Sequence, residues 1–566
     1  MLPEYWTIVL EAKTPYERSS ERFVFFWPLT SETRSAPAVS VLRFHRVYLF
    51  VAVFLIQFCS GSVYSLLSLA DPINRFFGFG DNSPEATNLL FEAGVFSLLS
   101  PALLGPLLER KGPRCSMAAG TLLTALGLLL SHAALLTSSW TLLHVGFDCI
   151  GFAFGAIVTS SISTALKWAP DVRGTVTGAC LLGSGVGTNV WRIAFEAILA
   201  SSFDNLRSLF GLLFAVLVPI LMLATLVLRT PPSDFSVRGH DMHCIPLEKA
   251  PNADMVLDEY FKVGMTLLNY NAIRPPSDCH HDGTDRQYYE QVKALTLPQC
   301  ILSTDFLCLF VAFAANGLSG LLYTEVTAVQ VEKDLLVTWY AITDDDATRV
   351  RLRGAVADLV GRFLISALSD VCIRLFYGNP AVVRKSGFVL LLLVQCIAVP
   401  MLYFASDNMS NFGTVEWLLY TVQFTANAGA SLIVCFLTDM YGVYHVGTMY
   451  GLVLMGWAVD QVVLGRAPLA SPTDLAHHVE LVWFISLGGL FLMWFVRTTS
   501  ADRFYRGYQL TICGKVLIQR PAKSRFGAEK THGCDADAGH PGSFFLLNSD
   551  SMRKLEVNDV LSPTTP

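Results

Sequence analysis

Long apolar stretches alternate with short polar segments along most of the chain. A stretch of about 20 apolar residues is long enough to cross a hydrocarbon layer about 30 Å thick as a helix. The pattern predicts twelve such spans in two groups of six, and therefore an all-α membrane protein with two six-helix halves. The predicted spans are residues 47–70, 86–108, 115–137, 140–166, 174–200, 207–229, 303–327, 353–376, 386–405, 414–438, 446–465 and 478–497.

The polar segments divide the chain into five parts. Residues 47–229 and 299–498 hold the two predicted halves, and the polar residues 230–298, rich in Pro, Asp and His, form a predicted cytosolic linker between them. Residues 1–46 lack the apolar core and cleavage site of a signal peptide, so we interpret them as a cytosolic N-terminal tail. Residues 499–566 are polar and are predicted to be a disordered cytosolic tail.

One glycine pattern occurs in both halves. The sequence GTVTGACLLG begins at Gly174 at the start of the fifth predicted span, and GTMYGLVLMG begins at Gly447 at the start of the eleventh. Small residues at such spacing let membrane helices pack closely. Two related halves of membrane helices are typical of secondary transporters, in which the substrate site lies between the halves.

Composition supports a membrane protein and narrows its class. The chain is 52% hydrophobic and 15% charged, with a mean hydropathy of +0.47, which is too apolar for a soluble protein of this length. The net charge of −6 lies largely in loops and tails and indicates no nucleic-acid partner. No phosphate-binding loop or catalytic motif is present, so we expect neither an ATP-driven pump nor an enzyme, and no cofactor or metal.

The distribution of Lys and Arg predicts the orientation. Cytoplasmic loops of membrane proteins carry the excess of basic residues. The loops after the second, fourth and eighth spans are the basic ones, so we expect both termini in the cytosol, in the plasma membrane or an organelle membrane, and a monomer. Three arginines that precede the eighth span on the predicted outer side, beside three aspartates, disagree with this orientation: Arg349, Arg351 and Arg353.

The loop after the second span resembles that of the major facilitator superfamily. The family pattern is Gly-x-x-x-Asp-Arg-x-Gly-Arg-Arg/Lys, and Gly105, Arg110, Gly112 and Arg114 match it, with Glu109 in place of the Asp. The resemblance covers residues 47–229 and 299–498. It implies a secondary active transporter that moves a small organic solute by alternating access.

A second segment resembles particular branches of that superfamily. The sequence KWAPDVRGTVTG from Lys167, with glycines at 183, 185 and 187, is similar to the oxalate-formate antiporter, nodulin-like and monocarboxylate transporter branches. Two features depart from these branches, since span one contains no Lys and Asp460 stands where the oxalate branch has a Lys. Without these lysines, a dicarboxylate site with two cations is disfavoured. The resemblance therefore favours a monocarboxylate or another small organic anion moved with a proton. An amino acid remains an alternative, as does a sensor or scaffold that does not transport.

Charged residues at the ends of spans are candidates for gating. Glu109, Arg110 and Arg114 can make charge-assisted contacts to neighbouring helix ends when the cytosolic side is closed. Asp370 ends the corresponding run in the second half. The alternative is that these residues only anchor helices at the membrane interface.

Ionisable residues within a span are costly and are candidates for function. Arg362 lies eight residues before Asp370, about 12 Å along the helix, and Asp358 lies on the same helical face. The Asp-x3-Arg arrangement resembles the monocarboxylate branch, which implies that Arg362 binds a substrate carboxylate and that Asp358 takes part in proton coupling. A structural ion pair is the alternative.

Other polar residues are expected at similar depth. Gln57, Asn427 and Asp460 lie an estimated distance of about 15 to 21 Å from their cytosolic helix ends, and we predict that they line one cavity with Arg362. Interhelical hydrogen bonding is the alternative for Gln57 and Asn427. Asp460 must meet a cation or take up a proton.

A second group lies nearer the outer side. Asp148 on span four and Arg192 on span five are predicted at matching depth, with His144 and Glu196 one helical turn further out. We expect a structural or gating network between these adjacent helices rather than substrate contact.

The linker contains residues of metal-ligand type. His240-x2-His243-Cys244 and Cys279-His280-His281 supply imidazoles and thiols. Their spacing is irregular, so we interpret them as solvated loop residues.

Overall fold

A computed structural model describes most of the chain. It covers residues 21–28, 38–79, 83–201, 205–232, 235–245, 286–327, 342–376, 378–407, 412–464, 472–498, 503–504, 507–512 and 515–521. Contacts divide the chain into two units, Met1–Phe504 and Tyr505–Pro566.

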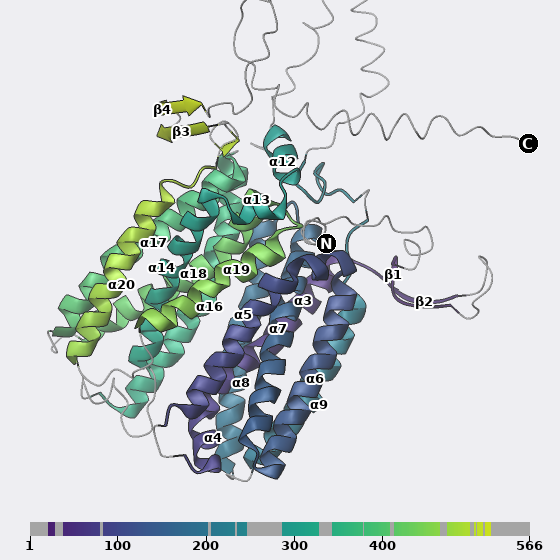
Figure 1. Cartoon of the computed structure of the whole chain (residues 1–566), viewed down its shortest axis with the longest axis vertical. Helices are drawn as coiled ribbons and strands as arrows, with labels where there is room; N and C mark the ends of the chain where they lie inside the picture. Colours follow the sequence, from purple (N-terminus) through teal and green to yellow (C-terminus); the bar gives the residue numbers. More distant parts are fainter. Residues whose placement is uncertain are drawn as a thin grey trace, which may run out of the picture. The chain divides into compact units, whose positions relative to one another are not determined.

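Twelve helices of 19 residues or more lie in the described part of the first unit (Figure 1). Each coincides with one predicted span. The first half contains α3 (Arg46–Ser65), α5 (Glu85–Lys111), α6 (Pro113–Thr137), α7 (Trp140–Trp168), α8 (Arg173–Ser201) and α9 (Asn205–Val227). The second half contains α14 (Thr304–Thr327), α16 (Asp344–Phe376), α17 (Pro380–Asp407), α18 (Phe412–Tyr441), α19 (Val446–Leu464) and α20 (Pro472–Met493).

By length and composition, eight of these helices in the described residues can cross a membrane. α19 and α20 have shorter apolar stretches in their described residues, and α8 and α16 fall outside both groups. α16 is the most polar of the twelve helices, and it packs against α8 across the two halves. α5 and α19 form a second pair of facing helices between the halves.

Large apolar side chains are both buried between helices and exposed on their outer faces. Phe147 and Phe210 are fully buried in the first half, and Phe388 and Phe436 are fully buried in the second. Exposed side chains on the outer faces include Leu122, Phe404, Trp417 and Phe484. A helix that is apolar on both its inner and outer faces suits a bilayer, where the solvent is hydrocarbon.

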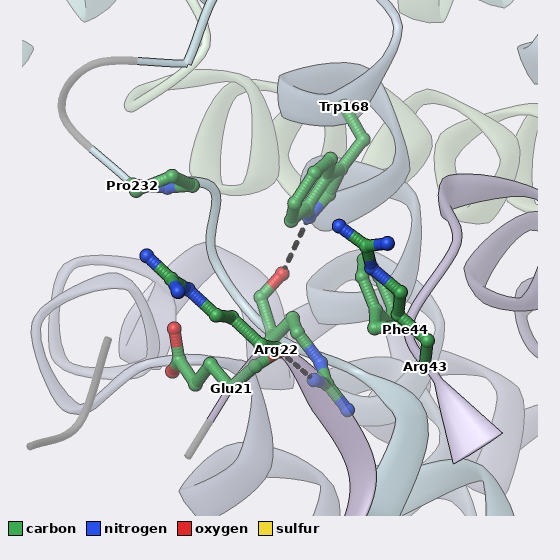
Figure 2. Close-up of a pocket in the computed structure, with 7 residues that line it drawn as sticks. Glu21, Arg22, Arg43, Phe44, Trp168 and Pro232 are labelled. Atoms are coloured by element: carbon green, nitrogen blue, oxygen red, sulfur yellow. Dashed lines mark hydrogen bonds between the residues drawn. The ribbon is translucent and has the colours of Figure 1, made fainter. Parts of the chain in front are cut away.

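Short elements stand outside the bundle at the end where α9 leads into the linker, which we call the linker end. Here β1 (Phe23–Pro28) pairs antiparallel with β2 (Ala38–Arg43). Trp168, the last residue of α7, donates a hydrogen bond from its indole N–H to the Arg229 carbonyl (2.7 Å), beside this hairpin (Figure 2). The first half also contains η1 (Leu66–Leu69) and α4 (Ala70–Phe77), and the second is preceded by α12 (Arg286–Lys293) and α13 (Leu297–Ile301).

The second unit contains a hairpin of its own. β3 (Gly507–Ile512) pairs antiparallel with β4 (Lys515–Pro521). The prediction of a disordered tail over residues 499–566 is therefore wrong for this segment. The tail strands are rich in Val, Leu, Ile and Tyr, which suit a pleated sheet. The prediction missed them because it rested on the average polarity of the whole tail.

Candidate functional site

The repeated glycine pattern lies where the two halves touch. A Cβ atom added to Gly174 on α8 would stand 2.1 Å from the Ser366 carbonyl oxygen of α16, and one on Gly178 would stand 3.1 Å from the Arg362 carbonyl oxygen. On the other pair of helices, a Cβ on Gly451 of α19 would stand 2.8 Å from Pro101 of α5. The pattern therefore serves close helix packing between the halves.

Asp370 of α16 caps the beginning of α8 across the boundary between the halves. Its carboxylate accepts hydrogen bonds from the backbone N–H groups of Gly174 (2.9 Å) and Thr175 (2.7 Å). The Thr175 hydroxyl donates a third bond (2.9 Å). The first N–H groups of a helix have no partner within it and carry the positive end of the helix dipole. A carboxylate from the second half thus satisfies the helix of the first half.

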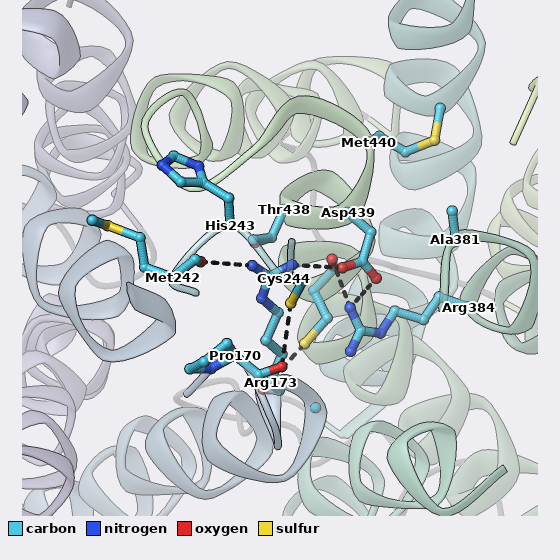
Figure 3. A network of polar contacts seen from close by, with 12 residues as sticks. Pro170, Arg173, Met242, His243, Cys244, Ala381, Arg384, Thr438, Asp439 and Met440 are labelled. Atoms are coloured by element: carbon cyan, nitrogen blue, oxygen red, sulfur yellow. Dashed lines mark hydrogen bonds and ion pairs between the residues drawn. The ribbon is translucent and has the colours of Figure 1, made fainter. Parts of the chain in front are cut away.

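A buried ion network continues from Asp370 to Arg384, Asp439 and Arg173, and Figure 3 labels the last three of these residues. Arg384 of α17 donates to Asp370 (3.2 Å) and pairs with Asp439 of α18. Arg173 of α8 reaches the same Asp439 carboxylate from the first half (2.9 Å). All four side chains are less than 8% exposed. Two arginines and two carboxylates balance in charge, and each charge has a partner, which is the condition for burying them.

A smaller network lies within the first half, between α5 and α7. Glu109 of α5 pairs with Lys167 of α7, and the Ser163 hydroxyl donates to the Glu109 carboxylate. Arg114 donates to the Leu228 carbonyl (2.9 Å) just after α9, and Lys167 belongs to the last turn of α7. Glu109 and Arg114 thus contact the ends of neighbouring helices within the first half, while a role in gating stays a prediction. Arg114 thus satisfies a helix end, whereas Glu109 is neutralised by a buried lysine. Arg110 is half-buried.

Part of the linker covers the Arg173 network. The Met242 carbonyl accepts a hydrogen bond from Arg173 (3.0 Å), and the Cys244 thiol donates to the Pro170 carbonyl (3.3 Å). His243 is 7% exposed and meets the Tyr444 ring at 4.9 Å. Burial and the nearby cations lower the pKa of His243 to about 3. The interpretation of His243 and Cys244 as solvated residues is therefore wrong.

No group of three or more His, Cys, Asp and Glu residues with metal-site geometry occurs in the described ranges. Residues 279–281, the second half of the metal-like pattern, lie outside those ranges.

Deeper between the halves, Arg362 and Asp358 form an ion pair on α16. The Arg362 Nε donates to the Asp358 carboxylate (2.7 Å), and Nη1 donates to the Ser184 hydroxyl of α8 (3.2 Å). The Arg362 side chain is 19% exposed and that of Asp358 is 8% exposed. The surroundings of Arg362 therefore include α16 of its own half and α8 of the other.

The guanidinium of Arg362 has capacity for a ligand. Two of its nitrogens donate to Asp358 and Ser184, and no acceptor in the described part of the chain contacts the third, Nη2. Gly185 allows this arrangement, since a Cβ there would stand 3.1 Å from the Arg362 Nε. A planar guanidinium with an unoccupied edge can bind a carboxylate through two parallel bonds.

The other three residues predicted to line a cavity with Arg362 each have a different outcome. The Gln57 amide donates to the Ser161 hydroxyl of α7 (3.4 Å), an interhelical bond within the first half. The Asn427 amide donates to the carbonyl of Gln423 in its own helix (3.0 Å). Asp460 belongs to α19, and its side chain lies outside the described residues. No described contact joins these three residues to Arg362.

The predicted network of Asp148 and Arg192 is not formed among the described residues. His144 instead lies 3.4 Å from the Glu92 carboxylate of α5, and Glu196 is exposed. Asp148 and Arg192 were predicted at equal depth in the membrane, but depth alone does not determine which faces of two helices are in contact.

Comparison with known proteins identifies the family. The sequence matches the model of the Major Facilitator Superfamily over residues 49–459. A sequence comparison with curated proteins finds no match.

Comparison with solved structures finds several transporters. A proton:xylose symporter bound to 6-bromo-6-deoxy-D-glucose is 13% identical, with 80% of this chain and 97% of that chain covered at a TM-score of 0.53. A bacterial homologue of the iron transporter ferroportin is 12% identical, with 79% and 98% covered at a TM-score of 0.51. A human organic anion transporter is 16% identical, with 79% and 99% covered at a TM-score of 0.48. The family model matches most of the chain, and the structure has two six-helix halves that meet at α8 and α16 and at α5 and α19. The chain therefore belongs to the Major Facilitator Superfamily.

Proposed function

We propose that the protein is a secondary active transporter for a small organic anion, with a monocarboxylate as the simplest substrate. The observation that carries the proposal is the Arg362 guanidinium, which is partly exposed between the halves and has an edge without a described acceptor. A substrate carboxylate would bind this edge. Before the substrate binds, Asp358 and Ser184 would hold the guanidinium in place.

The ion pair also suggests how a proton would be coupled. Arg362 and Asp358 are neutral as a pair, so an added carboxylate would leave a net negative charge in a buried site. Protonation of Asp358 would remove that charge and free Arg362 for the substrate. Substrate and proton would then bind together, and transport would be electroneutral.

We further propose that the linker end is the cytosolic end and that the structure has this end closed. The buried contacts of Asp370, Arg173 and Asp439 join the two halves here. Opening would require these contacts to separate, while the Arg362 site between the halves would become accessible from the cytosol.

Uptake into proteoliposomes with and without an inward pH gradient tests the substrate site. The substrate panel contains monocarboxylates, dicarboxylates and amino acids. We expect accumulation of a monocarboxylate driven by the gradient, abolished in Arg362→Ala and poorly restored in Arg362→Lys, because Lys lacks the planar fork. Arg353→Ala is the matched control, since Arg353 is on the same helix but 60% exposed and paired with Glu416.

Asp358→Asn separates binding from coupling. We expect this variant to exchange substrate across the membrane but not to accumulate it on a pH gradient. Wild-type accumulation by Arg362→Ala would refute the substrate site, and gradient-driven accumulation by Asp358→Asn would refute the proton step. An amino acid as the preferred substrate would replace the anion assignment.

A further inference from the structure

A cavity of about 570 Å³ lies at the linker end of the first half, away from the Arg362 site. Its volume falls within the range of about 300–1,000 Å³ typical of sites for small ligands. The lining residues come from the ends of the β1–β2 hairpin and from the ends of membrane helices: Glu21, Arg22, Arg43, Phe44, Trp168, Arg229 and Pro232.

The position of the cavity corresponds to the headgroup layer of a membrane. Phe44 precedes the first residue of α3 by two positions, Trp168 is the last residue of α7, and Arg229 follows the end of α9 by two positions. At a rise of about 1.5 Å per residue, each lies within a few ångströms of the end of a membrane helix. Tryptophan is enriched at this level of membrane proteins.

Arg229 supplies a fixed positive charge at the base of the cavity. It is 2% exposed, and it donates to the carbonyls of Glu21, Phe23 (3.2 Å) and Val227 (3.1 Å). Its guanidinium also lies 4.1 Å from the centre of the Phe44 ring. No carboxylate in the described residues forms an ion pair with it. Burial and the nearby Arg114 lower the pKa of Arg229 to about 10 and outweigh the opposite effect of the Glu21 carboxylate, so its charge is held at an electrostatic cost that a further anion would relieve.

Arg22 and Arg43 supply two further charges at the rim. The antiparallel register places Phe23 opposite Arg43, which brings Arg22 and Arg43 to the same end of the hairpin (Figure 2). Both are exposed. In the described part of the chain neither guanidinium has a hydrogen bond or an ion pair, so both can turn toward a ligand.

We propose that this cavity binds the phosphorylated headgroup of an anionic membrane lipid. Arg22 and Arg43 contact the phosphate, and Arg229 adds its charge from below. The Glu21 carboxylate lines the same cavity and disfavours a bare anion. Because a carboxylate has about four acceptor sites, it can accept a hydrogen bond from a ligand hydroxyl in addition to its existing interaction. A phosphorylated polyol, as in a phosphoinositide, combines both features. Basic pockets at helix ends are suited to such headgroups.

The test measures binding to the purified full-length protein in detergent. The ligands are short-chain phosphatidylinositol phosphate, short-chain phosphatidylcholine, soluble inositol phosphate and inorganic phosphate. The variant is Arg22→Gln with Arg43→Gln, two exposed positions whose substitution leaves the core intact. The matched control is Arg207→Gln, an exposed arginine at the opposite end of α9. Thermal unfolding checks that all proteins are folded.

We expect saturable binding of the phosphoinositide, weakened roughly 30-fold in the double variant and unchanged in the control. Phosphatidylcholine should not bind, because its headgroup lacks net charge. Inositol phosphate binding as tightly as the lipid, with the same loss in the double variant, would support the site with a soluble ligand as its source. Equal phosphoinositide binding by wild type and double variant would overturn the proposal, as would equal weakening by the control.

Discussion

The cap that Asp370 forms on α8 predicts a shift in the equilibrium between closed and open linker ends. Its carboxylate accepts three bonds from Gly174 and Thr175 and a fourth from Arg384. Only the bonds to α8 cross between the halves, so only they are lost on opening. Asp370→Ala removes them from the closed state while leaving the open state almost unaffected.

The magnitude follows from the kinds of bonds that are lost. Loss of an N-cap side chain costs about 0.5–2 kcal/mol, and loss of a hydrogen bond to a charged group costs about 1.5–3 kcal/mol. The bonds share one side chain, and water replaces part of them, so we expect a net loss of about 2–3 kcal/mol. The ratio of closed to open molecules should fall roughly 30- to 160-fold.

Electron spin resonance can measure this shift as a distance distribution. One spin label is attached to Cys115 at the start of α6 and the other to Val382→Cys near the start of α17, with the remaining cysteines replaced. Both sites are exposed and they belong to different halves at the linker end. We expect Asp370→Ala to move population from the short distance to a longer one.

Asp305→Ala is the control for a buried carboxylate at the same end. Asp305 accepts bonds from the Arg497 backbone (2.9 Å) and side chain (3.1 Å), and both residues belong to the second half. The control should lower thermal stability without changing the distance distribution. An unchanged distribution in Asp370→Ala, or an equal change in Asp305→Ala, would refute the assignment of the cap as a gate.

Three further predictions concern the same end of the molecule. Gly174→Ala should open the linker end in the same distance measurement, because its Cβ would lie 2.1 Å from a carbonyl oxygen, whereas Gly447→Ala should not, because its nearest neighbour is 3.7 Å away. Asp439→Asn should lower the free energy of unfolding by about 3–5 kcal/mol, seen in thermal unfolding, since Arg173 and Arg384 would lose a shared buried carboxylate. The docking of residues 235–245 should weaken as pH falls from 6.5 toward 3, by about 2 kcal/mol at pH 5, because the docked loop holds His243 neutral while the undocked loop protonates it. Hydrogen exchange of that loop, corrected for intrinsic rates, should lose this pH dependence in His243→Gln.

Hydropathy was sufficient to predict the helical bundle. All backbone polar groups must be satisfied within a membrane, so an apolar run of sufficient length has a helix as its only local solution. The twelve predicted spans therefore coincide with twelve described helices. The signal was weakest for α8 and α16.

The partners of charged residues could not be predicted in the same way. In the sequence, Arg173 and Arg384 belong to the basic loops that predict the cytosolic side, yet both are buried against Asp439. A count of basic residues says on which side of a membrane they lie, but it contains no information on which helix faces them. A carboxylate at the end of α18 was the one available signal, because a charge in an otherwise apolar run requires a partner.

Pairs within one helix were predictable because their geometry is local. Asp358 and Arg362 are four residues apart, and the structure joins them at 2.7 Å. Asp148 and Arg192 are on different helices, where rotation about each helix axis decides the contact, and the structure does not join them. At this site the sequence therefore predicted a contact within one helix but not a contact between two helices.

Arg362 and Asp370 both lie on α16, and both contact α8 of the other half. Arg362 contacts Ser184 of α8 at mid-depth, and Asp370 caps the first turn of α8 at the linker end. Both contacts cross between the halves, and the two residues are eight positions apart, about 12 Å along one continuous helix. A ligand can shift a conformational equilibrium only by binding one state more tightly than the other. A carboxylate that draws Arg362 away from Ser184 would weaken one inter-half contact on the same pair of helices that Asp370 holds together. The proposed substrate would therefore favour opening without touching the cap itself.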